Sequence, residues 1–428
     1  MKKYSLLIIA LFGIAVCIKA QANADIAKSF VQNISTAKYQ DALTLTDSAF
    51  QKAVSENRLE EIWAAIEQRI GSFTKIDSVI TDAKSVTVDA DFEKAQQPLN
   101  FYFNQDHQVV GFFLGHAVNK SALSDTSVYP EKDFSLVTPA GTLKGLLTSP
   151  LNATAQTPVA IIIAGSGPTD KDGNDAQMGL YTNDYKLLAD ALAKNGVACL
   201  RYDKRMVGES NNFSTDESKL RFDDYVNDVD SLIVSLRRNY TKIFLIGHSE
   251  GSLVGILAAE KMNPAGFISL AGAGENIADI LKKQLSTLPQ AQSIDSILNE
   301  LRNGNLVANT PKNLQSLFRA SVQPYLISWM KYNPEVEIAK LSCPALILQG
   351  NTDLQVSLQD ATNLKKGNPQ AQLKIIAGMN HILKDAPMER QANIATYANP
   401  SLPLNQELVD TIVGFIHAVP ALVQRDTQ

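Results

Sequence analysis

The stretch KIFLIGHSEGSLVGILAAEKM, residues 242–262, decides the fold. Its first residues are mostly apolar and predict a buried strand, whereas the residues after Ser249 have the spacing of a buried helix. Between them, glycines stand two places to either side of Ser249 in GHSEG. A Gly-x-Ser-x-Gly match is common by composition, so its setting matters more than the match. A strand before it and a helix after it predict a sharp turn that lifts the serine hydroxyl clear of a sheet.

After Phe134, apolar strand candidates alternate with helical patterns, beginning with a predicted hairpin around residues 139–141. The later strand candidates are VAIIIA, VACLRY, KIFLIG, GFISLA, PALILQG and LKIIAG. Apolar strands separated by helices predict an α/β fold with a mostly parallel sheet covered by helices on both faces. Between GFISLA and PALILQG, helical patterns predict a helical lid over about residues 275–340.

The part of the chain before about residue 120 has a different pattern of apolar residues. Helical periodicity runs through residues 26–34 and 59–66, and it changes to alternation in SVTVDADF and LNFYFNQDHQVVGFFL. Helices followed by half-buried strands predict a small α+β domain over residues 23–120. A polar linker over residues 119–133 then leads to a second domain over residues 131–422.

The first residues have the layout of a secretory signal peptide. Lys2 and Lys3 precede an apolar run of 14 residues, Ser5–Ile18, and the small residues Ala20 and Ala22 follow. A membrane-spanning helix needs about 20 apolar residues, so a cleaved signal over residues 1–22 is favoured over an anchor. The sequence predicts an exported protein, periplasmic or secreted, without a stable membrane span.

Charge and cysteine content narrow the class of protein further. Removing residues 1–22 takes away three lysines and no acid, which moves the net charge from −5 to about −8. An acidic balance argues against nucleic acid or an anionic membrane as a partner. Cys199 and Cys343 remain, both in apolar strand patterns, and are expected to be buried thiols without a disulfide framework.

A nucleophilic serine needs a neutral imidazole within hydrogen-bond reach. The chain has five histidines. His381 follows the strand LKIIAG, at the carboxyl end of the predicted sheet, where active sites of open α/β folds gather. His417 lies on an apolar face of the last predicted helix and is expected in the core. His381 is therefore the predicted base.

The imidazole in turn needs a carboxylate to orient it. Asp353 directly follows the strand PALILQG, whereas Asp360 and Asp385 stand near helix starts, where capping suits them. The predicted triad then occurs in the order Ser249, Asp353, His381, at intervals of 104 and 28 residues.

The stretch IIIAGSGPTDKDGND, residues 161–175, runs from a strand into a glycine-rich loop with three aspartates. It lacks the third glycine of a dinucleotide loop, the Gly-Lys-Ser/Thr of a phosphate loop, and the glycine and glutamate places of an EF-hand. An attacked carbonyl needs two backbone N–H groups at its oxyanion. Glu250 is the first predicted donor, and Ser166, or Gly167 beside it, is the second. The aspartates are expected to brace the turn, and a contact of one of them with substrate stays open.

Over about residues 131–420, the chain resembles the serine-aminopeptidase-like branch of the α/β-hydrolase superfamily. The segments AGSGPTDKDGN, YDKRMVGES, IGHSEGS, LQGNTDLQV and GMNHIL carry this resemblance, in that order. Members of the branch include exported bacterial carboxylesterases with a similar small N-terminal domain. The sequence departs from the family at Met206, where glycine is usual, so a differently shaped loop is expected there.

These features together predict an exported serine hydrolase that cleaves small carboxylic esters through an acyl-enzyme, without a metal or cofactor. Glu250 and the acids of the lid could instead bind the α-amino group of a peptide, so a serine aminopeptidase or amidase is the alternative. A non-catalytic binding protein on a hydrolase fold is the less favoured one. Acyl-chain length, oligomeric state and the role of the first domain stay open.

Overall fold

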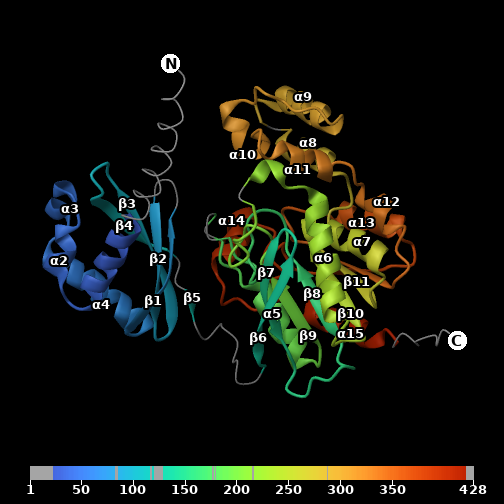
Figure 1. Ribbon diagram of the computed structural model, residues 1–428, viewed down its shortest axis with the longest axis horizontal. Helices are drawn as coiled ribbons and strands as arrows, with labels where there is room; N and C mark the ends of the chain where they lie inside the picture. Colours follow the sequence, from blue (N-terminus) through green and yellow to red (C-terminus); the bar gives the residue numbers. More distant parts are fainter. Residues whose placement is uncertain are drawn as a thin grey trace. The chain divides into compact units, whose positions relative to one another are not determined.

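The computed structural model describes residues 23–81, 85–115, 118–119, 129–175, 178, 180–214, 216–286 and 288–420. The chain divides into two compact units, Met1–Leu123 with Asn399–Ser401, and Ser124–Ala398 with Leu402–Gln428 (Figure 1). The boundary near residue 123 lies within the linker expected over residues 119–133. The predicted signal peptide lies outside the described residues.

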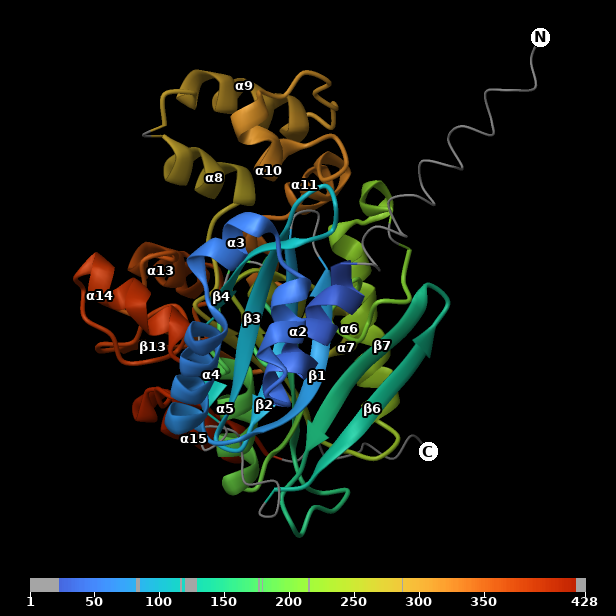
Figure 2. The same ribbon diagram turned by 90° about the vertical axis from the view of Figure 1, so that its left-hand side faces the viewer.

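The first unit consists of helices followed by an antiparallel sheet, as predicted (Figure 2). Its helices cover residues 23–35, then α2 (Tyr39–Thr44), α3 (Ser48–Ala53) and α4 (Glu56–Ile70). Its strands are β1 (Phe73–Thr81), β2 (Ser85–Phe92), β3 (Ala95–Phe103), β4 (Val109–Leu114) and β5 (Val118–Asn119). They pair in the order β1-β2-β3-β4, and β5 pairs with β3. Alternate residues of β2 are buried in one core with Phe30 and Trp63 of the helices, because only one face of the sheet is covered.

The second unit is built on an eight-stranded sheet with the order β13-β12-β11-β10-β8-β9-β7-β6. Its strands are β6 (Glu131–Thr138), β7 (Gly141–Thr148), β8 (Val159–Ile163), β9 (Ala198–Tyr202), β10 (Ile243–His248), β11 (Gly266–Leu270), β12 (Ala345–Gly350) and β13 (Gln372–Ile376). The predicted hairpin is confirmed as β6 and β7, which pair antiparallel. The strands from β8 onward are parallel to one another. Their carboxyl ends therefore lie along one edge of the sheet.

Helices cover both faces of this sheet, which makes the unit an α/β-hydrolase fold. On one face α5 (Asp184–Lys194) and α15 (Gln406–Ala418) pack through residues such as Leu188 and Ile412. On the other face lie α6 (Phe222–Leu236), α7 (Glu250–Met262) and α13 (Leu358–Gly367). Shorter helices, η2 (Glu217–Lys219), α14 (Arg390–Ala395) and η4 (Thr396–Ala398), lie in the connections. Cys199 and Cys343 are buried free thiols, as predicted.

The segment between β11 and β12 is helical, and its part up to Trp329 gathers apart from the sheet, above its carboxyl edge (Figures 1 and 2), whereas its last helix packs against α7 and α13. It contains α8 (Ile277–Leu285), α9 (Ala291–Arg302), η3 (Lys312–Leu314), α10 (Gln315–Phe318), α11 (Gln323–Trp329) and α12 (Pro334–Ile338). Residues 319–322, between α10 and α11, are not helical, because Pro324 at the start of α11 prevents a helix from continuing through it. This segment, here called the lid, has a small core of its own that includes Leu301 and Phe318.

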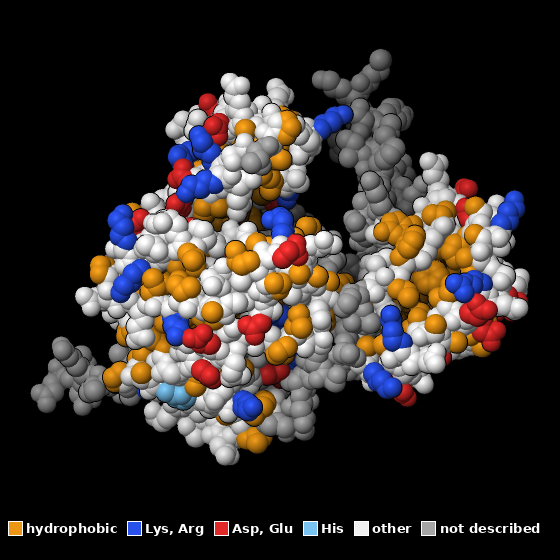
Figure 3. All heavy atoms as spheres, turned by 180° about the vertical axis from the view of Figure 1, so that it is seen from behind, with side chains coloured by type: hydrophobic (Ala, Val, Ile, Leu, Met, Phe, Trp, Pro, Cys, Tyr) orange, Lys and Arg blue, Asp and Glu red, His pale blue; other side chains and the backbone are white. Residues whose placement is uncertain are grey.

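Two surface properties bear on partners. Within the described part of the chain, no helix combines the length and the apolar character needed to cross a membrane. On the face drawn in Figure 3, lysine and arginine side chains are interspersed with aspartate and glutamate side chains over the second unit. That face accordingly presents mixed charge.

Candidate active site

Ser249 occupies the turn between β10 and α7, with φ 54° and ψ −119°. This backbone conformation is strained for a residue with a side chain. A Cβ at Gly247 would lie 2.3 Å from the carbonyl oxygen of Gly251, and one at Gly251 would lie 2.2 Å from that of Ile163. Both glycines are therefore required by close backbone packing, and the strand, turn and helix are those that the motif predicts.

His381 and Asp353 lie in the loops after the last two strands, and Nδ1 of His381 is 2.8 Å from Oδ2 of Asp353. The carboxylate is fully buried, and it also accepts from the N–H groups of Gln355 and Val356 and from the side-chain amide of Gln349. Burial would raise the pKa of Asp353, but the nearby imidazole and these hydrogen bonds lower it below its ordinary value. An ionised carboxylate only accepts, so Nδ1 of His381 carries the proton and Nε2 is left as the basic nitrogen.

His248, the residue directly before Ser249, links several parts of the site. Its Nε2 lies 2.8 Å from the backbone oxygen of His381, and its Nδ1 lies 2.7 Å from the Tyr185 hydroxyl. A carbonyl only accepts, so Nε2 donates and Nδ1 accepts from Tyr185. Burial lowers the pKa of His248 to about 3, which keeps the ring in the neutral form that this pattern requires. The Tyr185 hydroxyl in turn accepts from the N–H of Gly165, 3.1 Å away.

Two cavities meet at Ser249. The smaller, of about 120 Å³, is also lined by His381, Tyr185, Asp175 and Thr182. The larger, of about 430 Å³, lies beneath the lid. Its apolar lining consists of Ala273, Ile277, Ile280, Leu281, Leu317, Val322, Tyr325, Leu326, Trp329 and Val356. Ser166 lines both cavities beside Ser249. The site therefore offers a small polar space and a large apolar space on the two sides of one hydroxyl.

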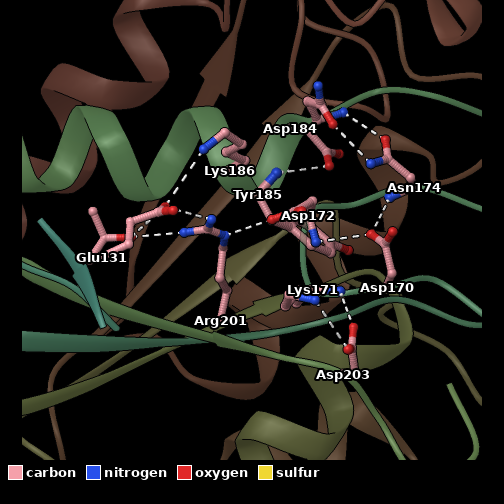
Figure 4. A network of polar contacts seen from close by, with 12 residues as sticks. Glu131, Asp170, Lys171, Asp172, Asn174, Asp184, Tyr185, Lys186, Arg201 and Asp203 are labelled. Carbon is pink, nitrogen blue, oxygen red and sulfur yellow. Dashed lines mark hydrogen bonds and ion pairs between the residues drawn. The ribbon is translucent and has the colours of Figure 1, made fainter. Parts of the chain in front are cut away.

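Asp170 and Asp172 brace the glycine-rich loop (Figure 4). Oδ1 of Asp170 accepts from the N–H groups of Asp172 and Asn174, at 2.9 and 2.8 Å, which is the expected Asx-type turn. Asp172 pairs with Nε of Arg201 at 2.8 Å, and the almost fully buried Arg201 also pairs with Glu131 at 2.7 Å. This ion-pair network joins the loop to β6 and β9. The expected bracing role is confirmed for these two residues.

Asp175 is placed differently from the other two aspartates. Its Oδ1 accepts from the N–H of Met178 at 3.1 Å, so it also shapes the loop. It lines the smaller cavity together with Ser249 and His381, whereas Asp170 and Asp172 line neither cavity. Of the three, Asp175 is the one within reach of a bound molecule. No group of three metal-ligating side chains gathers among the residues that the structure describes.

The structure corrects two expectations. Met206 has φ 66°, the left-handed conformation that glycine favours, so the loop keeps a glycine-like backbone instead of a different shape. His417 is exposed, and its Nε2 donates to the carbonyl of Asn195 at 2.9 Å, so it is not a core residue. Asp360, as expected, serves in a capping box with Ser357 at the start of α13.

The lid aromatics divide between two roles. Phe318 is fully buried in the core of the lid. Tyr325 and Trp329 line the larger cavity. Tyr325 is itself buried in the core of the second unit, so it belongs both to the core and to the cavity wall.

Known protein families match parts of both units of the chain. Residues 178–387 match the family described as serine aminopeptidase, S33, and residues 27–112 match a family described as a protein of unknown function, DUF3887. The chain is 22% identical to esterase EstD of Thermotoga maritima over 390 residues, which cover 84% of this chain and 89% of that protein.

The chain is also similar to several solved structures. Est1E of Butyrivibrio proteoclasticus, solved with ferulic acid, is 18% identical, and the match covers 67% of this chain and 99% of that one, with a TM-score of 0.45. The Pyrococcus furiosus esterase Pf2001 is 15% identical, over 69% of this chain and 93% of that one, with a TM-score of 0.44.

Proposed function

Because the second unit of this chain is a serine hydrolase domain of the α/β-hydrolase superfamily, we propose that it hydrolyses carboxylic esters, with Ser249 as the nucleophile. The observation that supports this most is the 2.8 Å contact between Nδ1 of His381 and the buried Oδ2 of Asp353, beside a cavity that Ser249 lines. A serine hydroxyl is too weakly acidic to attack a carbonyl unaided, whereas a neutral imidazole oriented by a carboxylate can take its proton.

The reaction proceeds in two halves. Oγ of Ser249 bonds to the ester carbonyl carbon while its proton passes to Nε2 of His381, and the carbonyl oxygen becomes an oxyanion. The oxyanion collapses, the bond to the alcohol oxygen breaks, and His381 returns the proton to the leaving alcohol. Water then repeats these steps on the acyl-enzyme, releasing the carboxylic acid and restoring Ser249. Asp353 stabilises the imidazolium that forms in each half.

The oxyanion needs donors that are already in place, and we assign these to the backbone N–H groups of Ser166 and Glu250. Glu250 is the first residue of α7, so its N–H is one of those left without a partner in the helix. Removal of one such donor typically lowers turnover by about 10²–10³-fold.

An ester is favoured over a peptide by the surroundings of Glu250. A carboxylate that recognised the α-amino group of a peptide would have to be free for it, but Oε1 of Glu250 lies 4.0 Å from the buried ammonium of Lys204. The larger cavity next to Ser249 has a mainly apolar lining, which suits an acyl chain. A serine aminopeptidase or amidase is the second candidate, supported by the family match over residues 178–387.

A fluorophosphonate probe and two sets of substrates test the proposal. The wild type should be labelled and should hydrolyse p-nitrophenyl esters faster than aminoacyl-nitroanilides. The Ser249→Ala variant should not be labelled and should hydrolyse neither class of substrate. Asp353→Asn should keep the fold and lower kcat by about 10³–10⁴-fold, because its amide stabilises the wrong tautomer of His381. Equal labelling of the wild type and Ser249→Ala would contradict the assignment of Ser249 as the nucleophile. A wild type that is neither labelled nor active on any of these substrates would favour a binding protein. A preference for the nitroanilides would favour the aminopeptidase.

We also propose that the protein is exported, on the basis of the apolar run Ser5–Ile18 after Lys2 and Lys3. Expression of the full chain in a bacterial host and sequencing of the N-terminus of the product test this. A mature N-terminus just after Ala20 or Ala22 is expected, and a product that keeps Met1 in the cytoplasm would contradict it.

A further inference from the structure

Lys204 is a buried lysine that the reaction as described does not use. It lies in the loop after β9, within the YDKR segment, and its side chain is 3% exposed. Its Nζ donates to the backbone carbonyl of Gly165 and lies 4.0 Å from Oε1 of Glu250. Placing a lysine head group in the interior is unfavourable unless it is well paired. These two polar partners belong to segments that carry a proposed oxyanion donor, and the ring of Tyr225 in α6 packs against the ammonium, 5.3 Å from its centroid to Nζ.

Gly165 has both of its polar backbone atoms held by buried side chains. Its carbonyl oxygen accepts from Lys204, and its N–H donates to the hydroxyl of Tyr185 at 3.1 Å. A Cβ at this position would lie 3.3 Å from Cβ of Ser249, so the backbone passes close to the nucleophile. The two contacts prevent the peptide units on either side of Gly165 from rotating.

This clamp determines the direction of the next N–H group. In a planar trans peptide the carbonyl and the following N–H point in opposite directions. With the Gly165 carbonyl directed at Lys204, the N–H of Ser166 points away from Lys204. Ser166 lines both cavities that meet at Ser249. Among the described residues, neither this N–H nor that of Glu250 donates to a protein acceptor.

We propose that Lys204 is the positioning residue of the oxyanion hole: it holds the Gly165–Ser166 peptide so that the Ser166 N–H faces the reacting carbonyl. This inference rests on the proposed function. A positive charge at the carbonyl end of a peptide unit also polarises that unit, which makes its N–H a stronger donor. Lys204 therefore acts on the transition state through the peptide and without touching the substrate. The hydroxyl of Tyr185 holds the same backbone in place by accepting from the N–H of Gly165.

The main competing role for Lys204 is a structural one, as the counter-ion of Glu250. Burial lowers the pKa of Lys204, and the nearby Glu250 carboxylate partly offsets this shift. Burial likewise raises the pKa of Glu250, and the Lys204 ammonium partly offsets that shift. Removal of Lys204 alone would leave the buried carboxyl group of Glu250 without its counter-ion, which is destabilising whatever the role in catalysis. A double variant that neutralises both groups separates the two roles.

The experiment compares Lys204→Met, the double variant Lys204→Met/Glu250→Gln, and Lys186→Met as a matched control. Lys186 is another buried lysine of the same unit, but its ammonium pairs with Glu131, 3.6 Å away. For each variant, kcat and KM are measured on a p-nitrophenyl ester, together with the inhibition constant of an alkyl trifluoromethyl ketone. Ser249 converts this ketone to a hemiketal whose anionic oxygen occupies the oxyanion hole.

Both Lys204 variants should show kcat lowered by about 10–100-fold, KM within about threefold of wild type, and ketone binding weakened by a factor similar to that in kcat. The control should keep both constants within about threefold. Recovery of kcat and ketone affinity in the double variant would overturn the inference and leave only the ion-pair role. If Lys204→Met does not fold, the double variant alone decides between these outcomes. Failure of the proposed function is distinct, since the wild type would then show no ester hydrolysis that depends on Ser249.

Discussion

The Nε2 atom of His248 donates to the backbone carbonyl of His381, 2.8 Å away, and the two rings pack with their centroids 4.8 Å apart. The residue before Ser249 in the chain thereby holds the loop that carries the proposed base. His248 is the last residue of β10 and directly precedes Ser249, so the nucleophile and the anchor of the His381 loop are neighbours in the chain.

Replacement of His248 by leucine should lower kcat by about 10-fold, because the loop of His381 loses its anchor while the base itself remains. The buried His381 carbonyl and Tyr185 hydroxyl each lose their hydrogen bond to His248, so the free energy of unfolding should fall by about 2–3 kcal/mol. Steady-state kinetics and urea denaturation measure the two effects. His417→Gln is the control, since His417 also donates to a backbone carbonyl but from an exposed position. An unchanged kcat in His248→Leu would show that His381 is held by other contacts.

The same histidine makes stability depend on pH. The pKa of His248 is held at about 3 in the folded protein, whereas an unfolded histidine titrates near 6.5. The unfolded state therefore takes up this proton first, and stability is lost as the pH falls from about 6.5 toward 3. At pH 5 this one group should destabilise the wild type by about 2 kcal/mol relative to pH 7.5. Denaturation at both pH values should give a smaller difference for His248→Leu, and an equal difference for both proteins would contradict the assignment.

The larger cavity should determine the preferred acyl length. Leu281 lies on its wall in α8, is partly exposed and packs at the edge of the lid core, so Leu281→Trp should fill part of the cavity. We expect kcat/KM for p-nitrophenyl octanoate to fall by about 10-fold or more, while the value for the acetate changes less than about threefold. The ratio of the two values reports the effect independently of enzyme concentration. A parallel loss on both esters would mean that the acyl chain does not enter this cavity.

Met206→Gly should stabilise the protein. Met206 has φ 66° and is 37% exposed, so little packing is lost when its side chain is removed. Relief of the left-handed strain, less the entropy that glycine adds to the unfolded chain, should raise the free energy of unfolding by about 0.5–1 kcal/mol. Chemical denaturation measures this, with Met178→Gly as a control at another exposed methionine. A lower stability for Met206→Gly than for wild type would show that the side chain makes packing contacts that outweigh the strain.

Much of the fold followed from local patterns. The alternation of apolar strands and helices, the hairpin before them and the lid between β11 and β12 are all visible as changes of period along the chain. The positions of Asp353 and His381 could be predicted because parallel strands bring their carboxyl ends to one edge of the sheet. Residues that directly follow two such strands therefore lie near each other at that edge. The bracing role of Asp170 was equally local, since an Asx-type turn closes within four residues.

Other features depended on residues that meet only in the folded chain. Lys204 lies 39 residues from Gly165, Tyr185 lies 63 from His248, and His248 lies 133 from His381. No periodicity marks such pairs, because side-chain hydrogen bonds across a core depend on how strands and helices stack and not on spacing along the chain. Local residue order thus specified the strand, the strained turn and the order Ser249, Asp353, His381. Tertiary packing alone decided how Gly165 is clamped, which tautomer His248 adopts and which aspartate reaches the cavity, since each requires groups from three separate elements to converge.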